Sequence, residues 1–501
     1  MADRAPASTS FRSVLKHTGI YGLGSVGIRI AGLLLVPLYT YNLTPPEFGI
    51  MEYLDLTALF LGMLFSLGLS NAIYRYYYAT EDPAERRRVV STALVPVLVT
   101  AGAVSVLMIA LAPLLADRLF HDPRFRHYLT VVFLGFGFNA VAEFGMTYLM
   151  ARQRSAVYSG LTVLKFVIGA LLNIWFLVGL HLGVRGILYS NLITNLAFGI
   201  YLAWVVIREN GFGFSRPLFR GMVRYGYPLV LVQLSLFGIN FADRFFLQAY
   251  GGFGQVGIYA LAYKFGIMLN TLFVASFFQV WNARSFEVAN DPGAGAFYTR
   301  VFTYFASGLV AAGLGMSLII KDVIGILAPP TYAAAAGLVP LVVLCYVFNG
   351  IGTYFELGLK LRNRTGRLGI IFAGTCLLCL ALYRLWIPRY GMFGAVAATG
   401  VAFLAKAVWV FVTSQRVYPI RFEFGRVARL TVVAVAVLAL RWFLPSLSRG
   451  ASLAAGVLLF LVFLGALLLS GWLRPDERAT ARAMLHRGAA WMRRPAGAGP
   501  R

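Results

Sequence analysis

Fourteen long apolar stretches divide this chain and leave only short segments between them. The hydrocarbon core of a bilayer is about 30 Å thick, so a helix needs about 20 apolar residues to cross it. Backbone groups in lipid must hydrogen-bond internally, and no stretch alternates with period two, which predicts helices and excludes a β-barrel. The expected spans are residues 17–41, 50–78, 88–116, 128–150, 156–180, 186–207, 224–249, 255–283, 299–321, 334–359, 368–387, 391–415, 428–444 and 451–472. We predict an all-α polytopic membrane protein of about 14 transmembrane helices.

The second half of the chain repeats the first at an offset of about 208 residues. PPEFGIMEY at residues 45–53 aligns with FGQVGIYAL at 253–261, so that Gly49 falls on Gly257. Further matches are MARQRS at 150–155 with KLRNRT at 360–365, Asn139 with Asn349, and GVRG at 183–186 with GMFG at 391–394. Membrane proteins built from two parallel repeats are characteristic of alternating-access transporters, whose site lies between the repeats.

The repeat and the loop composition predict a domain organisation with two pseudo-symmetric six-helix lobes. The expected parts are an N-lobe at 1–207 (spans 1–6), a linker at 208–223, a C-lobe at 224–416 (spans 7–12), two additional spans within 417–473 and a basic tail at 474–501.

The net charge of +25 follows the predicted loops. With the amino terminus placed inside, and with basic residues at the ends of spans counted with the adjoining segment, the inside segments hold 30 of the 44 lysines and arginines and the outside loops hold nine. The positive-inside rule produces such a bias, so we expect both termini to be cytoplasmic in a multi-pass protein of the bacterial inner membrane. The basic residues thus reflect topology, and no nucleic-acid partner is expected.

Charged residues inside spans are costly and usually face a cavity or a partner. Arg29 lies twelve residues into span 1, about 18 Å along the helix. With Lys264 and Arg244 it forms a candidate set of cavity cations for an anionic substrate. Asp55, Glu143 and Asp243 are candidates for ion coupling. Structural pairing remains an alternative for each of them, and Lys165 and Lys406 are expected to pair within a lobe or to reach the inner interface.

Several features argue against an enzyme. The loops between spans are short, so they leave no room for a soluble catalytic domain. Cys376 and Cys379 have metal-like spacing, but they stand in an apolar run without a second pair or a nearby histidine, and small hydrophobic residues explain them better. We expect no catalytic residue, no metal and no cofactor.

Several motifs resemble the bacterial polysaccharide flippases of the MOP (MATE-related) superfamily, the Wzx-like O-antigen and exopolysaccharide transporters. These motifs are GIYGLGSVGIRIAGLLLVPLYTYNLTPPEFGIMEY from Gly19, LFSLGLSNAIYRYY ending at Tyr77, RYGYPLV at 224–230, ADRFF at 242–246 and GIYALAYK at 257–264. The resemblance implies two six-helix lobes around a cavity lined by spans 1, 2, 7 and 8. It also implies an undecaprenyl-diphosphate-linked oligosaccharide as substrate, with Arg29 and Lys264 as cavity cations. Membrane lipids and the polymerase and export machinery of a surface polysaccharide, such as lipopolysaccharide, are the other expected partners.

Other functions remain open at this stage. A lipid II flippase of the MurJ type also has fourteen spans, although its first span usually carries more than one arginine. A MATE-type drug antiporter and a membrane polysaccharide polymerase or ligase are further alternatives.

Overall fold

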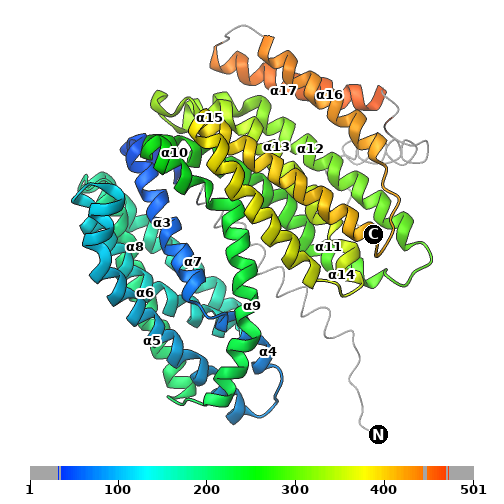
Figure 1. The fold of residues 1–501 in the computed structure, drawn as a ribbon. Helices are drawn as coiled ribbons and strands as arrows, with labels where there is room; N and C mark the ends of the chain where they lie inside the picture. The colour runs from blue at the N-terminus through cyan, green and yellow to red at the C-terminus, as the bar shows by residue number, and fades with distance from the viewer. Residues whose placement is uncertain (1–31, 33–34, 444–447, 470–471, 473–501) are drawn as a thin grey trace, which may run out of the picture. The chain divides into compact units, whose positions relative to one another are not determined.

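The computed structural model describes residues 32, 35–443, 448–469 and 472 of the chain. Most of the predicted first span, with Arg29, lies outside the described residues. The described helices are α2 (Val36–Asn42), α3 (Pro45–Phe65), α4 (Leu69–Tyr77), α5 (Pro83–Leu115), α6 (Arg124–Ala151), α7 (Ser155–Ile174), α8 (Val184–Asn210), α9 (Arg216–Phe241), α10 (Asp243–Leu269), α11 (Ser276–Glu287), α12 (Ala294–Leu327), α13 (Ala335–Phe355), α14 (Leu357–Leu361), α15 (Gly366–Gln415), α16 (Phe424–Phe443) and α17 (Arg449–Leu469), with short π-helical turns η1 (Ala116–Phe120), η2 (Trp175–Gly179) and η3 (Asn270–Ala275) and a 3₁₀ turn η4 (Pro330–Tyr332) (Figure 1).

Ten helical stretches among the described residues are long and apolar enough to cross a membrane. Two of them exceed a single crossing, since residues 216–287 and 366–415 contain 72 and 50 residues. Each is broken by a glycine with positive φ, at Gly252 (φ 72°) and Gly391 (φ 55°). The predicted all-α membrane architecture is therefore confirmed, and the number of fourteen spans stays a prediction.

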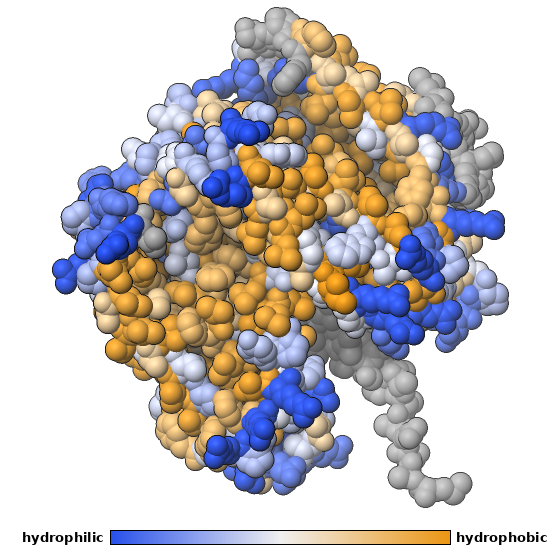
Figure 2. Space-filling view, viewed as in Figure 1, coloured by the Kyte–Doolittle hydropathy of each residue, from blue (hydrophilic) through white to orange (hydrophobic). Residues whose placement is uncertain are grey.

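Broad apolar surfaces accompany these helices. Apolar side chains cover most of the face drawn in Figure 2, and hydrophilic side chains gather at separate places on it. Large side chains such as Val106, Leu171 and Trp175 are exposed. Exposed apolar patches of this extent are rare in water-soluble monomers, whereas lipid tails solvate them without cost.

The chain forms two compact units. One contains Met1–Arg284 and Ile324–Tyr418, and the other contains Ser285–Val323 and Pro419–Arg501. In the first unit α6 packs along α5 and α8, α10 packs on α3, and α13 packs on α15 (Figure 1). In the second unit the Ser452 hydroxyl donates to Asp322 at 2.8 Å, and Arg441 lies 3.8 Å from the same carboxylate.

Local signals in the sequence set the ends of the helices. α3 begins with a capping box, in which the Thr44 backbone amide donates to Glu47 at 2.9 Å and two prolines occupy the first turn. Such a cap stabilises a helix by about 1 kcal/mol. Gly68, with φ of 68°, separates α3 from α4, and its backbone packs directly on the backbone of Gly226 in α9.

Equivalent positions of the repeat have the same backbone conformation. Gly183 and Gly391 have φ/ψ of 57°/−136° and 55°/−132°. Gln153 and Asn363 are both left-handed, with φ of 56° and 54°. After each, the next amide donates five residues back, from Arg154 to Leu149 and from Arg364 to Leu359. Unusual conformations that recur at the sequence offset support two structural copies of one unit.

The equivalent glycines of the repeat also meet in space. α3 crosses α10 where Gly49 faces Gly257. A Cβ atom on Gly49 would lie 2.9 Å from the Gly257 nitrogen, and one on Gly257 would lie 3.0 Å from the Gly49 nitrogen. This reciprocal contact is what equivalent helices make on either side of a two-fold axis, and it requires the absence of side chains at both positions.

Candidate functional site

A cavity of about 620 Å³, lined by both apolar and polar side chains, lies among the membrane-spanning helices of the first unit. Its walls come from α3, α4, α5, α6, α8 and α9. The polar side chains that line it are Asp55, Glu143, Asn71, Asn139, Asn191, Asn195, Gln233, Ser66, Ser70 and Thr100. Asp55 is ten residues into the 21-residue α3, which places the cavity near the middle of a span.

Helical periodicity explains why these side chains converge. Asn139 and Glu143 are four residues apart on α6, and Asn191 and Asn195 are four apart on α8, so each pair shares one helix face. α6 and α8 pack along each other, which brings the two polar faces into the same space. Polar groups at this depth are expected to face the protein interior or water, because lipid offers them no hydrogen-bond partner.

Two predicted acidic residues line this cavity. The Asp55 side chain is exposed to its open space, and no described residue forms an ion pair with it. Glu143 lies 3.8 Å from the Lys165 ammonium, which also donates to the Asn139 carbonyl oxygen at 3.2 Å. Lys165 therefore pairs within its own repeat, as predicted.

The described lining residues of the cavity include no lysine or arginine. Lys264, a predicted cavity cation on α10, forms an ion pair with Glu52 on α3 and lies 5.3 Å from the Phe48 ring centre. The pair is partly exposed, with 30% of the lysine and 19% of the glutamate side chain accessible. It links the two repeats beside the Gly49–Gly257 crossing.

The remaining predicted pair is buried and self-compensating. The Arg244 guanidinium donates to Asp243 at 2.7 Å and to the Asn240 carbonyl at 2.7 Å. The Asp243 carboxylate also accepts from the Tyr259 hydroxyl, and the Arg244 guanidinium lies 4.3 Å from the Tyr263 ring centre. With 3% and 0% of their side chains exposed, the two charges do not reach the cavity. The cavity thus receives Asp55 and Glu143 of the predicted residues, but not Lys264, Arg244 or Asp243, and Arg29 lies outside the described residues.

Sequence reasoning missed Glu52 and the amides. Glu52 stands in the same apolar run as Asp55, so the criterion of a charge inside a span could have found it. The neutral pair Asn191 and Asn195 carries a weaker signal, namely two amides on one face of an apolar helix.

Polar side chains that converge at mid-depth among spanning helices are typical of the substrate and ion pathways of membrane transporters. Sequence comparison then gives the family: a sequence model described as "Polysaccharide biosynthesis protein" matches residues 14–282, more than half of the chain. The chain belongs to this polysaccharide biosynthesis protein family, as the resemblance predicts.

One curated relative is the EPS I polysaccharide export inner membrane protein EpsE of Ralstonia nicotianae (strain ATCC BAA-1114 / GMI1000). It is 34% identical over 119 residues, and the match covers 22% of this chain and only 27% of that protein.

Solved structures share the fold. The lipid II flippase MurJ in an inward closed conformation superposes with a TM-score of 0.70 at 14% identity, covering 90% of this chain and 99% of that one. An inward-facing multidrug resistance MATE family transporter of the MOP superfamily gives 0.60 at 15% identity, covering 78% and 97%. The comparisons thus give a multi-pass membrane protein of the polysaccharide biosynthesis family with the fold of these transporters.

Proposed function

We propose that this protein flips an undecaprenyl-diphosphate-linked oligosaccharide from the inner to the outer leaflet of the cytoplasmic membrane by alternating access. The product would serve surface polysaccharide synthesis, such as that of O-antigen or exopolysaccharide. The family match and the similarity to a polysaccharide export protein support the class of cargo. The observation that carries the proposal is the amide-rich cavity at mid-depth.

The cavity chemistry suits a glycan. Five amide side chains line it, and each amide offers both hydrogen-bond donors and acceptors. Sugar hydroxyls likewise donate and accept, so amides and carboxylates can exchange hydrogen bonds with them in place of water. A group that leaves water for the membrane interior without such partners would lose several kcal/mol per polar atom, in rough terms. A polar cavity therefore lowers the barrier to moving the headgroup.

The diphosphate requires positive charge, and we assign it to Arg29 and Lys264. Arginine offers a two-pronged fork to phosphate, and lysine offers a mobile point charge. Lys264 is neutralised by Glu52, so binding of a phosphate would exchange one anionic partner for another. Asp55 and Glu143 remain the candidates for coupling to an ion, while the buried Arg244–Asp243 pair favours a structural role.

We further propose that both termini are cytoplasmic. The support is the positive-inside bias of the lysines and arginines. Reporter fusions after residues 45, 251 and 447 are expected to read as external. A cytoplasmic signal at all three positions contradicts this topology.

A second candidate is a flippase for lipid II, favoured by the fold shared with MurJ over 90% of this chain. The two functions predict different cargo under the same assay. If the protein flips polysaccharide precursors, its deletion leaves polyprenyl-linked oligosaccharide in the inner leaflet and removes surface polysaccharide, while cell-wall synthesis stays intact. If it flips lipid II, its deletion instead leaves peptidoglycan precursor in the inner leaflet and causes lysis.

The direct test uses the purified protein in vesicles that carry extracted lipid-linked oligosaccharide. Glycan on the outer leaflet, measured by its accessibility to a lectin or a glycosidase, is expected to rise with the protein and not with a heat-denatured control. Unchanged accessibility under an ion gradient of either sign would refute the proposed function.

A further inference from the structure

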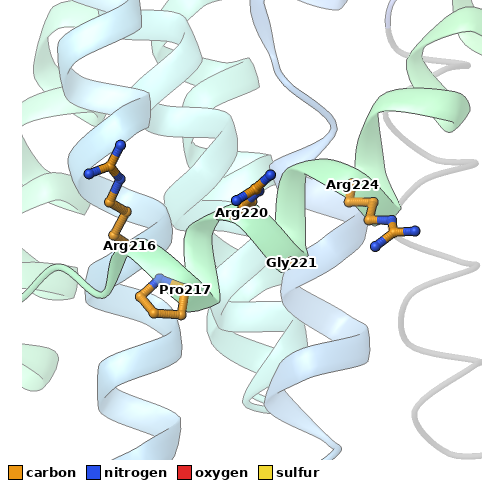
Figure 3. Close-up of a pocket in the computed structure, with 5 residues that line it drawn as sticks. All are labelled: Arg216, Pro217, Arg220, Gly221 and Arg224. Carbon is orange, nitrogen blue, oxygen red and sulfur yellow. The ribbon is translucent and has the colours of Figure 1, made fainter.

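Three arginines form a stripe along the start of α9. Arg216, Arg220 and Arg224 follow one another at intervals of four residues, so they lie on one face of the helix. With Pro217 and Gly221 they line a pocket of about 490 Å³, and Figure 3 shows their side chains leaving successive turns of the same helix. All three side chains are exposed.

The charge of this stripe is not balanced in the way that the charge of the basic pair Arg152 and Arg154 is. Arg152 and Arg154 both bind the Glu209 carboxylate, the latter at 2.7 Å. Within the described part of the chain, no carboxylate forms an ion pair with any arginine of the α9 stripe. Three neighbouring guanidinium groups repel one another. Because no protein carboxylate neutralises them, they favour the binding of an anion from outside the protein.

Neighbouring side chains fix this part of α9 in place. Gly221 allows the Tyr76 hydroxyl of α4 to approach closely, since a Cβ atom there would lie 2.7 Å from its oxygen. The Arg75 guanidinium stacks over the Tyr225 ring at 4.5 Å, which holds a fourth cation against the same turn of α9. The basic surface is thus built on two packed helices rather than on a free loop.

Exposed aromatic side chains flank the pocket along the chain. Phe212 and Phe214, just before α9, are 69% and 51% exposed, and Tyr227, after the stripe, is 54% exposed. Exposed aromatic side chains at a helix end are typical of the membrane–water interface. We therefore expect the pocket to lie near the membrane–water interface.

We propose that Arg216, Arg220 and Arg224 form a binding site for the phosphate groups of an anionic lipid headgroup. The three residues extend over about 12 Å of helix at 1.5 Å per residue, which suits more than one phosphate at a time. Guanidinium groups bind phosphate oxygens in pairs, and a diphosphate presents several such oxygens to the three arginines. A role of this site in loading the lipid diphosphate rests on the proposed function. Phosphate binding by the three arginines does not depend on it.

The test measures binding to the full-length protein in nanodiscs of neutral lipid. Farnesyl diphosphate, phosphatidylglycerol and inorganic pyrophosphate are titrated in turn. The site variant is R216Q/R220Q/R224Q, and the control R87Q/R88Q/R208Q removes the same charge from exposed arginines outside the pocket. Titrations at about 0.15 M and about 1 M salt separate a built site from general attraction, because the Debye length falls from about 8 to about 3 Å.

The site variant is expected to bind farnesyl diphosphate at least about tenfold more weakly than the control variant, and to keep this difference at high salt. An equal loss for phosphatidylglycerol identifies bulk lipid as the source of the phosphate, and a loss confined to farnesyl diphosphate identifies the transported lipid. Equal affinity of the two variants overturns the site. Pyrophosphate binding as tight as that of farnesyl diphosphate overturns the assignment to a lipid.

Failure of this inference can be told apart from failure of the proposed function. A protein that flips glycan-linked lipid but binds diphosphate equally well in both variants keeps the function and loses the site. One that binds diphosphate through the stripe but flips no glycan keeps the site and loses the function.

Discussion

Substitution of alanine for Gly49 or Gly257 should weaken the crossing of α3 and α10. An added Cβ on Gly49 would overlap the Phe253 carbonyl oxygen and lie 2.9 Å from its carbonyl carbon. That oxygen would lie 2.0 Å from the Cβ, whereas real Cβ atoms essentially never have contacts under 3.0 Å, so the helices would have to separate by about 1 Å or more. The atoms in the way belong to the backbone, so no rotamer change can relieve the overlap.

The size of the effect follows from two opposing contributions. Overpacking of a close contact costs about 1–3 kcal/mol. Alanine is about 1 kcal/mol more favourable than glycine within a helix, which offsets part of this cost. Gly160→Ala is the matched control, because Gly160 lies within α7 and a Cβ there would meet nothing within 4 Å. The helix preference is common to both variants, so their difference of about 1–3 kcal/mol isolates the contact.

The assay is thermal unfolding of the purified variants in one detergent, with glycan export as a second readout. Gly49→Ala and Gly257→Ala should each unfold at a lower temperature than Gly160→Ala. The double variant should lose less than the sum of the single losses, because the first substitution already separates the helices. Equal unfolding temperatures for Gly49→Ala and Gly160→Ala would refute the close crossing.

The remaining predictions concern charge and transport. Arg29→Ala is expected to give a folded protein at normal expression that exports no glycan, and Arg29→Lys should retain partial export; normal surface polysaccharide with Arg29→Ala would contradict a cavity role. Glu52→Gln leaves Lys264 without its anionic partner, so thermal stability should fall. Glu52→Lys combined with Lys264→Glu should restore the stability, and no recovery would contradict a purely electrostatic role of the pair. Asp55→Asn should leave the unfolding temperature nearly unchanged because Asp55 pairs with no described cation, yet should slow ion-driven flipping in vesicles; unaltered flipping would exclude it from coupling. Glu143→Gln should reduce flipping and also free Lys165, so a fall in stability beyond that of Asp55→Asn is expected from the same unfolding measurement.

The architecture follows largely from the sequence by itself. Span length and polarity are properties of each segment, since each helix satisfies its own backbone in lipid. The internal repeat is also visible in short sequence matches, and its equivalent residues Gly183 and Gly391 have nearly the same φ and ψ. The resemblance carried by the motifs agrees with the family that the comparison identifies.

Only the tertiary structure decides which charges meet. A charge inside a span predicts a partner or a cavity, but the choice depends on the rotation and register of packed helices. Lys264 finds Glu52 at a separation of 212 residues because α3 and α10 cross closely at two glycines. Arg244 instead turns to its neighbour Asp243, while Asp55, three residues from Glu52, points into the cavity. All of these are charged residues within apolar runs, and their different surroundings come from the packing of the folded chain.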